Sequence, residues 1–243
     1  MRQQGNALFL ILISVALFAA LSYAVTQSGR SGGSADKEKT IIHASEIVEY
    51  AASLQYSVMR MSLLGTVDTN FSFANSFDSG YEHTPPQPSE NQVFSTNGGS
   101  VPYMVPKTEW LETSNSAETT YQKWYFPPNV CIMDIPEIDS APFCYQDTTG
   151  SSEDIVVFLT YLKKDICIEI NNKLGVVNPG GNPPIDVGSS LGWAYEKFTG
   201  VFSDAVSIDR SGQLDGEYTA CFESGNVPVA GTYHFYNVLK ARE

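Results

Sequence analysis

The sequence predicts an α+β protein, in which an N-terminal apolar helix precedes a disulfide-stapled domain with an antiparallel sheet and packed helices. Three observations predict this class. No charged residue lies between Arg2 and Arg30, apolar residues recur at helical spacing in two later segments, and two segments near the C-terminus alternate between apolar and polar residues.

Charge is distributed unevenly along the 243 residues. The chain has 27 acidic and 14 basic residues, a net charge of -13, and the part from Ser31 onward holds 12 basic and all 27 acidic residues, a charge of -15. Nucleic-acid binding is disfavoured because it needs clustered Lys and Arg. The 13 Tyr, 13 Phe and 3 Trp argue against disorder. We therefore expect one acidic globular domain of about 200 residues behind an uncharged leader.

Residues 6–26 are the predicted apolar helix. At ~1.5 Å per residue, such a helix covers about the ~30 Å hydrocarbon core of a bilayer. Three interpretations are open. The segment is a secretory signal cleaved after Ala24, a permanent membrane anchor, or a retained helix that follows a very short leader of residues 1–5.

The basic leader Met1-Arg2-Gln3-Gln4-Gly5, followed directly by Asn6 and the apolar run, resembles the type IV pilin and pseudopilin family. The resemblance implies cleavage between Gly5 and Asn6, after which the helix packs in the core of a filament. The family usually begins its mature chain with Phe or Met and has Glu at the fifth position, where this chain has Asn6 and Leu10. Some minor, tip-located members also lack that Glu. The resemblance assigns these helix residues to assembly: Leu8, Leu10, Ile11, Leu12, Val15, Leu17 and Phe18.

Residues 27–39 are rich in Gly and Ser and are predicted to be a flexible linker, or the locally melted part of a pilin helix. An extracytoplasmic domain follows over residues 40–243. Its first element is a predicted helix over 40–64, which Gly65 ends in the left-handed conformation. The apolar stripe of this helix comprises Ala44, Ile47, Val48, Ala51, Leu54, Val58 and Met61.

A second helix is predicted over 152–174, with Ser152 as its cap and Gly175 after its end. Its expected buried face comprises Ile155, Phe158, Leu159, Leu162, Ile166 and Ile170. Residues 217–223 and 232–239 are predicted to pair as an antiparallel hairpin, and short strands are expected at 70–73, 92–95 and 130–134. Core positions rather than an adhesive patch are expected for Trp110, Tyr121, Trp124, Tyr125 and Phe126.

All four cysteines lie beyond the apolar helix, at Cys131, Cys144, Cys167 and Cys221. An even number there favours disulfides in an oxidising compartment over zinc, since the chain has no C-x-x-C pair. Cys131 and Cys144 flank a short Pro-containing segment and are predicted to pair. Cys167 and Cys221 would then join a helix to a strand.

One enzymatic motif is present. Gly188-Ser189-Ser190-Leu191-Gly192 matches G-x-S-x-G, and Asp209 or Asp215 and then His234 follow in the order of the α/β-hydrolases. The motif lacks a preceding buried strand and an alternating strand–helix pattern, so we expect no enzyme activity. Oxygen-bearing residues between 204 and 217 make Asp209 and Asp215 weak calcium candidates, but their spacing does not fit an EF-hand and favours a solvated turn. No cofactor is predicted.

The sequence therefore predicts a structural subunit, major or minor, of a pilus-like or pseudopilus-like surface filament, with its acidic domain displayed outside. Its expected partners are copies of itself or related pilins, and the inner membrane before assembly. The alternatives are a Sec-exported binding or adhesion domain and a secreted serine hydrolase.

Overall fold

The computed structural model describes residues 5–28, 32–132, 153–187, 196–203, 206–208 and 212–242. The chain divides into two compact units, Met1–Thr40 and Ile41–Glu243. The first unit contains α1 (Gly5–Ser28) and the first turns of α2 (Gly32–Leu63). In the described part of the chain, no helix combines the length and the apolar character needed to cross a membrane.

The helix α2 begins well before the predicted start at residue 40. Residues 32–39, for which we expected a flexible linker, are helical. The segment Asp36-Lys37-Glu38-Lys39 explains part of the difference, because Lys and Glu are good helix formers. The Thr40 hydroxyl also donates to the Asp36 carbonyl at 3.0 Å. The predicted end is confirmed, since α2 stops at Leu63 and Gly65 has a φ of 101°.

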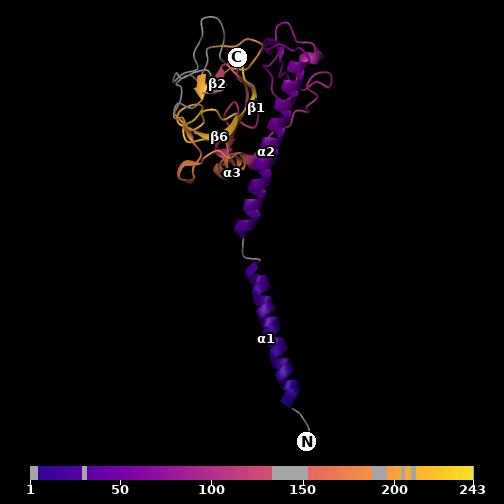
Figure 1. Ribbon diagram of the computed structural model, residues 1–243, viewed down its shortest axis with the longest axis vertical. Helices are drawn as coiled ribbons and strands as arrows, with labels where there is room; N and C mark the ends of the chain where they lie inside the picture. Colours follow the sequence, from indigo (N-terminus) through magenta and orange to yellow (C-terminus); the bar gives the residue numbers. More distant parts are fainter. Residues whose placement is uncertain are drawn as a thin grey trace. The chain divides into compact units, whose positions relative to one another are not determined.

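The second unit is built on a mixed sheet (Figure 1). Within the described residues its strand order is β1 (Trp124–Tyr125), β3 (Ile155–Leu162), β7 (Tyr233–Lys240), β6 (Thr219–Ser224) and β4 (Ile185–Asp186). Neighbouring strands are antiparallel, except that β4 runs parallel to β6. A separate parallel pair consists of β2 (Val130–Ile132) and β5 (Val206–Ile208). The α+β class is confirmed. The sheet that we expected to be antiparallel is mixed, because β4 joins its edge parallel to β6.

Two of the strand predictions are confirmed. β6 and β7 form the C-terminal antiparallel hairpin, with Cys221 opposite Phe235, and β2 lies within the predicted strand 130–134. The segments 70–73 and 92–95 instead meet through one parallel bridge between Ser72 and Gln92. Short 3-10 turns fall at Asp68–Asn70, Ser89–Asn91, Thr108–Trp110, Thr113–Asn115 and Pro179–Gly181.

The helix predicted over 152–174 is wrong in its first half. Residues Ile155–Leu162 form the strand β3, and the helix α3 occupies only Lys164–Leu174. Every residue of β3 is buried, because the strand lies between β1 and β7 and both faces of the sheet are covered. In an unbroken apolar run, the positions at helical spacing and those at strand spacing are all apolar. The periodicity therefore could not distinguish a helix from a strand. The predicted helix end is confirmed, since Gly175 has a φ of 83°.

Two hydrophobic clusters cover opposite faces of the sheet. The first cluster joins α2 and α3 to alternate residues of β3, such as Val157 and Leu159. The second cluster takes the intervening residues, Val156 and Phe158, together with β2 and β5. The predicted core positions Trp110, Trp124, Tyr125 and Phe126 are buried, and Tyr121 packs at the margin of the first cluster.

Candidate assembly surface and cavities

The helix α1 exposes apolar side chains on every side. Each described side chain in this helix, from Phe9 to Tyr23, is exposed, including Leu10 at 59% and Phe18 at 74%. The hydroxyl of Ser14 donates to the carbonyl of Leu10 at 2.9 Å, so its hydrogen is already bonded within the helix. The other predicted assembly residues among these exposed side chains are Ile11, Leu12, Val15 and Leu17. Gly5, Asn6 and Leu8 lie in α1, but their side chains are outside the described residues.

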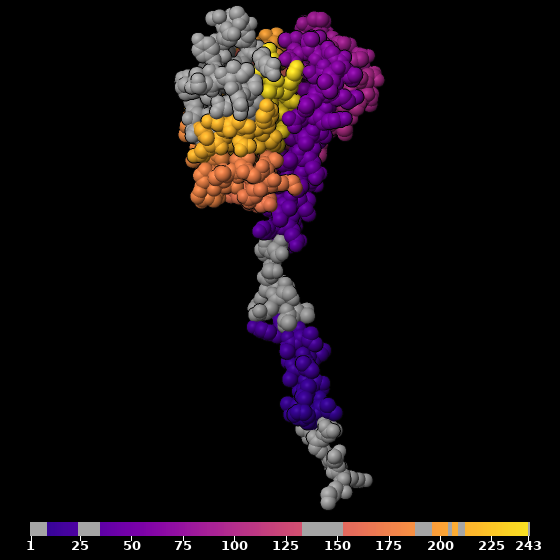
Figure 2. Space-filling model, viewed as in Figure 1, coloured from indigo at the N-terminus to yellow at the C-terminus, as the bar shows by residue number. Residues whose placement is uncertain are grey.

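The helix α2 has a second apolar stripe besides the one that we predicted. The predicted stripe faces the core, with Ala44, Ile47, Ala51, Leu54, Val58 and Met61 buried and Val48 packed against them. The outer stripe comprises Ile42, Tyr56, Met59 and Leu63, exposed at 55%, 72%, 52% and 89%. α2 lies along the visible surface of the domain in Figure 2. The spacing of Tyr56, Met59 and Leu63 is a helical signal that the sequence reasoning missed because it searched for one face only.

A buried disulfide joins α3 to β6. Cys167 and Cys221 are bonded, which confirms the second predicted pairing. Cys131 also takes part in a disulfide, and its predicted partner, Cys144, lies outside the described residues.

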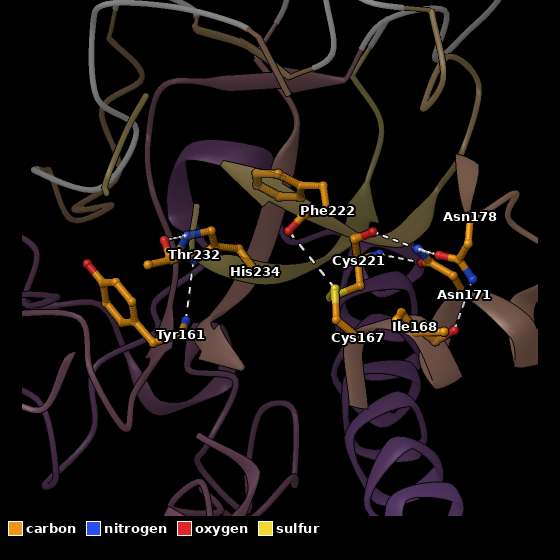
Figure 3. Close-up of a disulfide and its surroundings, with 9 residues drawn as sticks. All are labelled: Tyr161, Cys167, Ile168, Asn171, Asn178, Cys221, Phe222, Thr232 and His234. Carbon is orange, nitrogen blue, oxygen red and sulfur yellow. Dashed lines mark hydrogen bonds between the residues drawn. A yellow bond between two sulfur atoms is a disulfide. The ribbon is translucent and has the colours of Figure 1, made fainter. Parts of the chain in front are cut away.

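Asn171 connects the same two elements beside the disulfide (Figure 3). Its Oδ1 accepts a hydrogen bond from the Cys221 backbone N–H at 2.8 Å, and its Nδ2 donates to the Cys221 carbonyl at 2.8 Å. β4 pairs with β6 only at Glu223 and Ser224. The Asn171 amide therefore takes the place of a neighbouring strand at Cys221, and it does so while fully buried.

His234 is a structural residue of β7 rather than an accessible base (Figure 3). Its Nδ1 accepts from the Tyr161 backbone N–H at 3.4 Å, and its Nε2 lies 2.7 Å from the Thr232 hydroxyl. Because the Thr232 hydroxyl donates to the Val229 carbonyl at 2.5 Å, we assign the proton between Thr232 and His234 to Nε2. Complete burial lowers the pKa of His234 to about 3, so the ring is neutral.

This environment removes the base that the G-x-S-x-G interpretation requires. The motif itself, Gly188–Gly192, and Asp209 lie outside the described residues, while Asp215 is exposed. Of the two calcium candidates, Asp215 is therefore described by the structure and Asp209 is not. Among the residues that the structure does describe, no group of three His, Cys, Asp or Glu side chains could hold a metal ion.

A cavity is lined in part by Tyr161 and Thr232, the two residues that hydrogen-bond to His234. It has a volume of about 380 Å³ and is lined by Glu112, Ser114, Asn115, Tyr161, Leu162, Gly231, Thr232 and Tyr233. Tyr161 has a φ of 59°, which is rare for an aromatic residue. It occupies the irregularity in the pairing of β3 with β7 between Leu159 and Leu162. The bond to His234 and a 2.8 Å bond from the Glu112 N–H to the Tyr161 carbonyl hold this conformation.

Comparison of the chain with protein-family models, curated proteins and solved structures finds no match. A function for this chain is therefore inferred from its own residues and their placement.

Proposed function

We propose that this chain is a structural subunit of a type IV pilus-like or pseudopilus-like filament, in which α1 packs among the helices of other subunits and the acidic domain is displayed outside. One observation carries the proposal: α1 is apolar on every side and its described side chains are exposed. A helix that is apolar all round is stable only when another surface covers it.

The exposed side chains of α1 provide a strong drive for association. Ten large apolar residues between Phe9 and Tyr23 are exposed, and burying each contributes roughly 1.5–3 kcal/mol. Even partial burial against neighbouring helices would offset the roughly 4–15 kcal/mol cost of fixing a subunit in an assembly. Because no charged side chain lies between Arg2 and Arg30, no side-chain charge opposes the packing of these helices against one another.

The charge of the domain favours the outside of such an assembly. The segment from Ser31 onward carries a charge of -15, and like charges separate best at the solvated periphery. The outer stripe of α2 offers a second apolar surface for subunit contacts, centred on Tyr56, Met59 and Leu63. The proposal includes cleavage between Gly5 and Asn6, a stage in the inner membrane before assembly, and related pilins as possible co-subunits.

Detergent dilution of the chain that begins at Asn6, the proposed mature subunit, tests assembly. We expect wild-type protein to form sedimenting filaments visible by negative-stain electron microscopy, because removal of detergent uncovers α1. Val15→Asp should prevent this, since it places a charge on the buried surface of the filament. Val177→Asp is the matched control, because Val177 is an exposed valine of the domain. Wild-type protein that stays monodisperse, or Val15→Asp protein that assembles equally well, would refute the proposal.

Mass spectrometry of the N-terminus separates this proposal from the alternatives. A mature chain that begins at Asn6 agrees with pilin-type processing. A chain that begins at Val25 has lost all but the last turn of α1 and fits a Sec-exported binding or adhesion domain. One that begins at Met1 fits a plain anchor.

A further inference from the structure

A second cavity in the domain has an aromatic wall. Its volume is about 250 Å³, and it is lined by Ala74, Asn75, Ser76, Phe77, Gln92, Phe94, Ser95 and Tyr103. Cavities for drug-sized ligands usually measure about 300–1,000 Å³, so this one suits a single small ring. Its residues come from three separate segments of the chain, which pack together at the margin of the first hydrophobic cluster.

The aromatic rings in this cavity have defined positions. Phe77 is stacked on Tyr103, with ring centroids 5.2 Å apart and planes 14° apart, and yet it is 61% exposed. Phe94 meets Tyr103 edge to face at 5.2 Å and 75°. One face of Phe77 is therefore fixed by the stack, while most of the remaining ring surface is open to solvent.

The loop that carries Phe77 is held in place by its neighbours. The Asn75 Oδ1 accepts from the backbone N–H groups of Phe77 at 2.9 Å and Asp78 at 2.8 Å. Asp78 is buried and forms ion pairs with Lys123 at 3.1 Å and Lys197 at 2.6 Å. An exposed phenylalanine in a loop fixed at both ends is preorganised for contact with a ligand, because little conformational entropy remains to be lost on binding.

The polar groups of the cavity are uncharged. Ser76 and Ser95 contribute hydroxyls, and Gln92 contributes a carboxamide whose Nε2 donates to the Gln87 carbonyl at 2.8 Å. Among the described residues, that bond leaves the Gln92 Oε1 as an acceptor. Burial raises the pKa of Tyr103 to about 12, so its phenol is neutral as well. The described lining therefore offers hydrogen bonds and ring faces but no counter-charge.

We propose that this cavity binds a neutral pyranose unit of a glycan. A pyranose ring has an apolar face of C–H groups, which suits the open ring of Phe77, and a rim of hydroxyls that can both donate and accept hydrogen bonds. Ser76, Ser95 and Gln92 supply both kinds of partner. A proline-rich peptide offers backbone carbonyls to the serine hydroxyls but few N–H donors for the Gln92 Oε1, whereas a pyranose supplies donors and acceptors around one ring.

Ligand-observed NMR on the unassembled full-length chain tests this site independently of filament formation. The chain is kept in a detergent without a sugar headgroup, and the probes are methyl glycosides of neutral hexoses and of N-acetylhexosamines. We expect binding that Phe77→Ala and Phe77→Leu each weaken about five- to tenfold, because both remove the aromatic face. Phe77→Tyr should retain wild-type affinity. Tyr218→Leu, which alters an exposed aromatic residue outside the cavity, should have no effect.

Three results would overturn the assignment. One is the absence of binding by every probe, and another is wild-type affinity in Phe77→Leu. The third is preferential binding of a proline-rich peptide that tolerates Phe77→Leu, which would assign the cavity to a peptide. Because Phe77 is exposed, its replacement should leave the far-UV circular dichroism and the urea-unfolding midpoint of the domain nearly unchanged, so a loss of binding would not reflect unfolding.

Discussion

Replacing Asp154 should change how the stability of the domain depends on pH. The Asp154 side chain is fully buried. Its Oδ2 accepts from the backbone N–H of Ile132 at 3.0 Å, and its Oδ1 accepts from the backbone N–H of Arg242 at 3.2 Å. Burial nevertheless dominates and raises the pKa of Asp154 to about 7, because the charged form loses its hydration.

The sign and size of the effect follow from this pKa. In the unfolded chain the carboxyl ionises near its ordinary pKa of 3.8, whereas in the folded chain it holds its proton up to about pH 7. Between these values the folded state binds more protons at Asp154, so the contribution of this residue to the free energy of unfolding falls as pH rises. At about 1.4 kcal/mol per pH unit the total loss is about 4 kcal/mol, and it is complete above pH 7.

The Asp154→Asn variant should abolish this slope. Its carboxamide has one oxygen for two backbone donors, so below pH 4 we expect it to be about 1 kcal/mol less stable than wild type. At pH 8 it should be about 3 kcal/mol more stable. Urea unfolding of both proteins from pH 3.5 to 8.5 measures the difference, with the exposed Glu109→Gln as a control that should follow wild type. A difference between wild type and Asp154→Asn that does not vary with pH would refute the reasoning.

Three further changes probe the buried polar groups. The pKa of His234 is lowered to about 3, so the contribution of this residue to the free energy of unfolding should fall by about 5 kcal/mol as pH falls from 6.5 to 3, opposite in sign to that of Asp154. Subtraction of a His234→Gln urea series from the wild-type series should reveal this slope. Replacing both Cys167 and Cys221 by Ala removes a disulfide between cysteines 54 residues apart. The unfolded chain then gains entropy, so the free energy of unfolding measured in urea should fall by about 4 kcal/mol. Asn171→Leu should lower the free energy of unfolding by about 2–4 kcal/mol in the same measurement, because it leaves the buried backbone N–H and carbonyl of Cys221 unpaired. The control Asn172→Leu, at an exposed position, should lower it by less than about 0.5 kcal/mol.

Sequence patterns predicted the elements whose signals are local. The inner stripe of α2 and the C-terminal hairpin were predictable because each has one periodicity over one continuous segment. The strand β3 was not predictable in this way, since burial on both faces replaces alternation with a continuous apolar run. The β-branched residues Ile155, Val156 and Val157 were the available sign that this run favours a strand.

The two candidate sites, α1 and the aromatic cavity, also differ in whether their residues form a local pattern in the sequence. The helix α1 was predicted because its apolar residues are consecutive in the chain. The aromatic cavity brings Phe77, Phe94 and Tyr103 together through loops without a repeating pattern, so no spacing in the sequence indicated it. Likewise, the sequence shows that His234 comes after Asp209 and Asp215 in the chain order of a hydrolase triad. Only the fold shows that the His234 ring is buried and hydrogen-bonded to Tyr161 and Thr232.

The buried polar residues Asn171, His234 and Asp154 share one structural role, which explains why apolar patterning could not assign them. Asn171 bonds to Cys221 where β4 is too short to pair with β6. His234 accepts from the Tyr161 N–H where the register of β3 shifts, and Asp154 accepts from the buried backbone N–H of Ile132 in β2. In each place the strands leave a backbone group unpaired in an apolar interior, and the side chain supplies its partner. An apolar substitute of equal volume would restore the packing and still leave that group unsatisfied, so these residues are determined by the interruptions of the sheet rather than by its hydrophobic pattern.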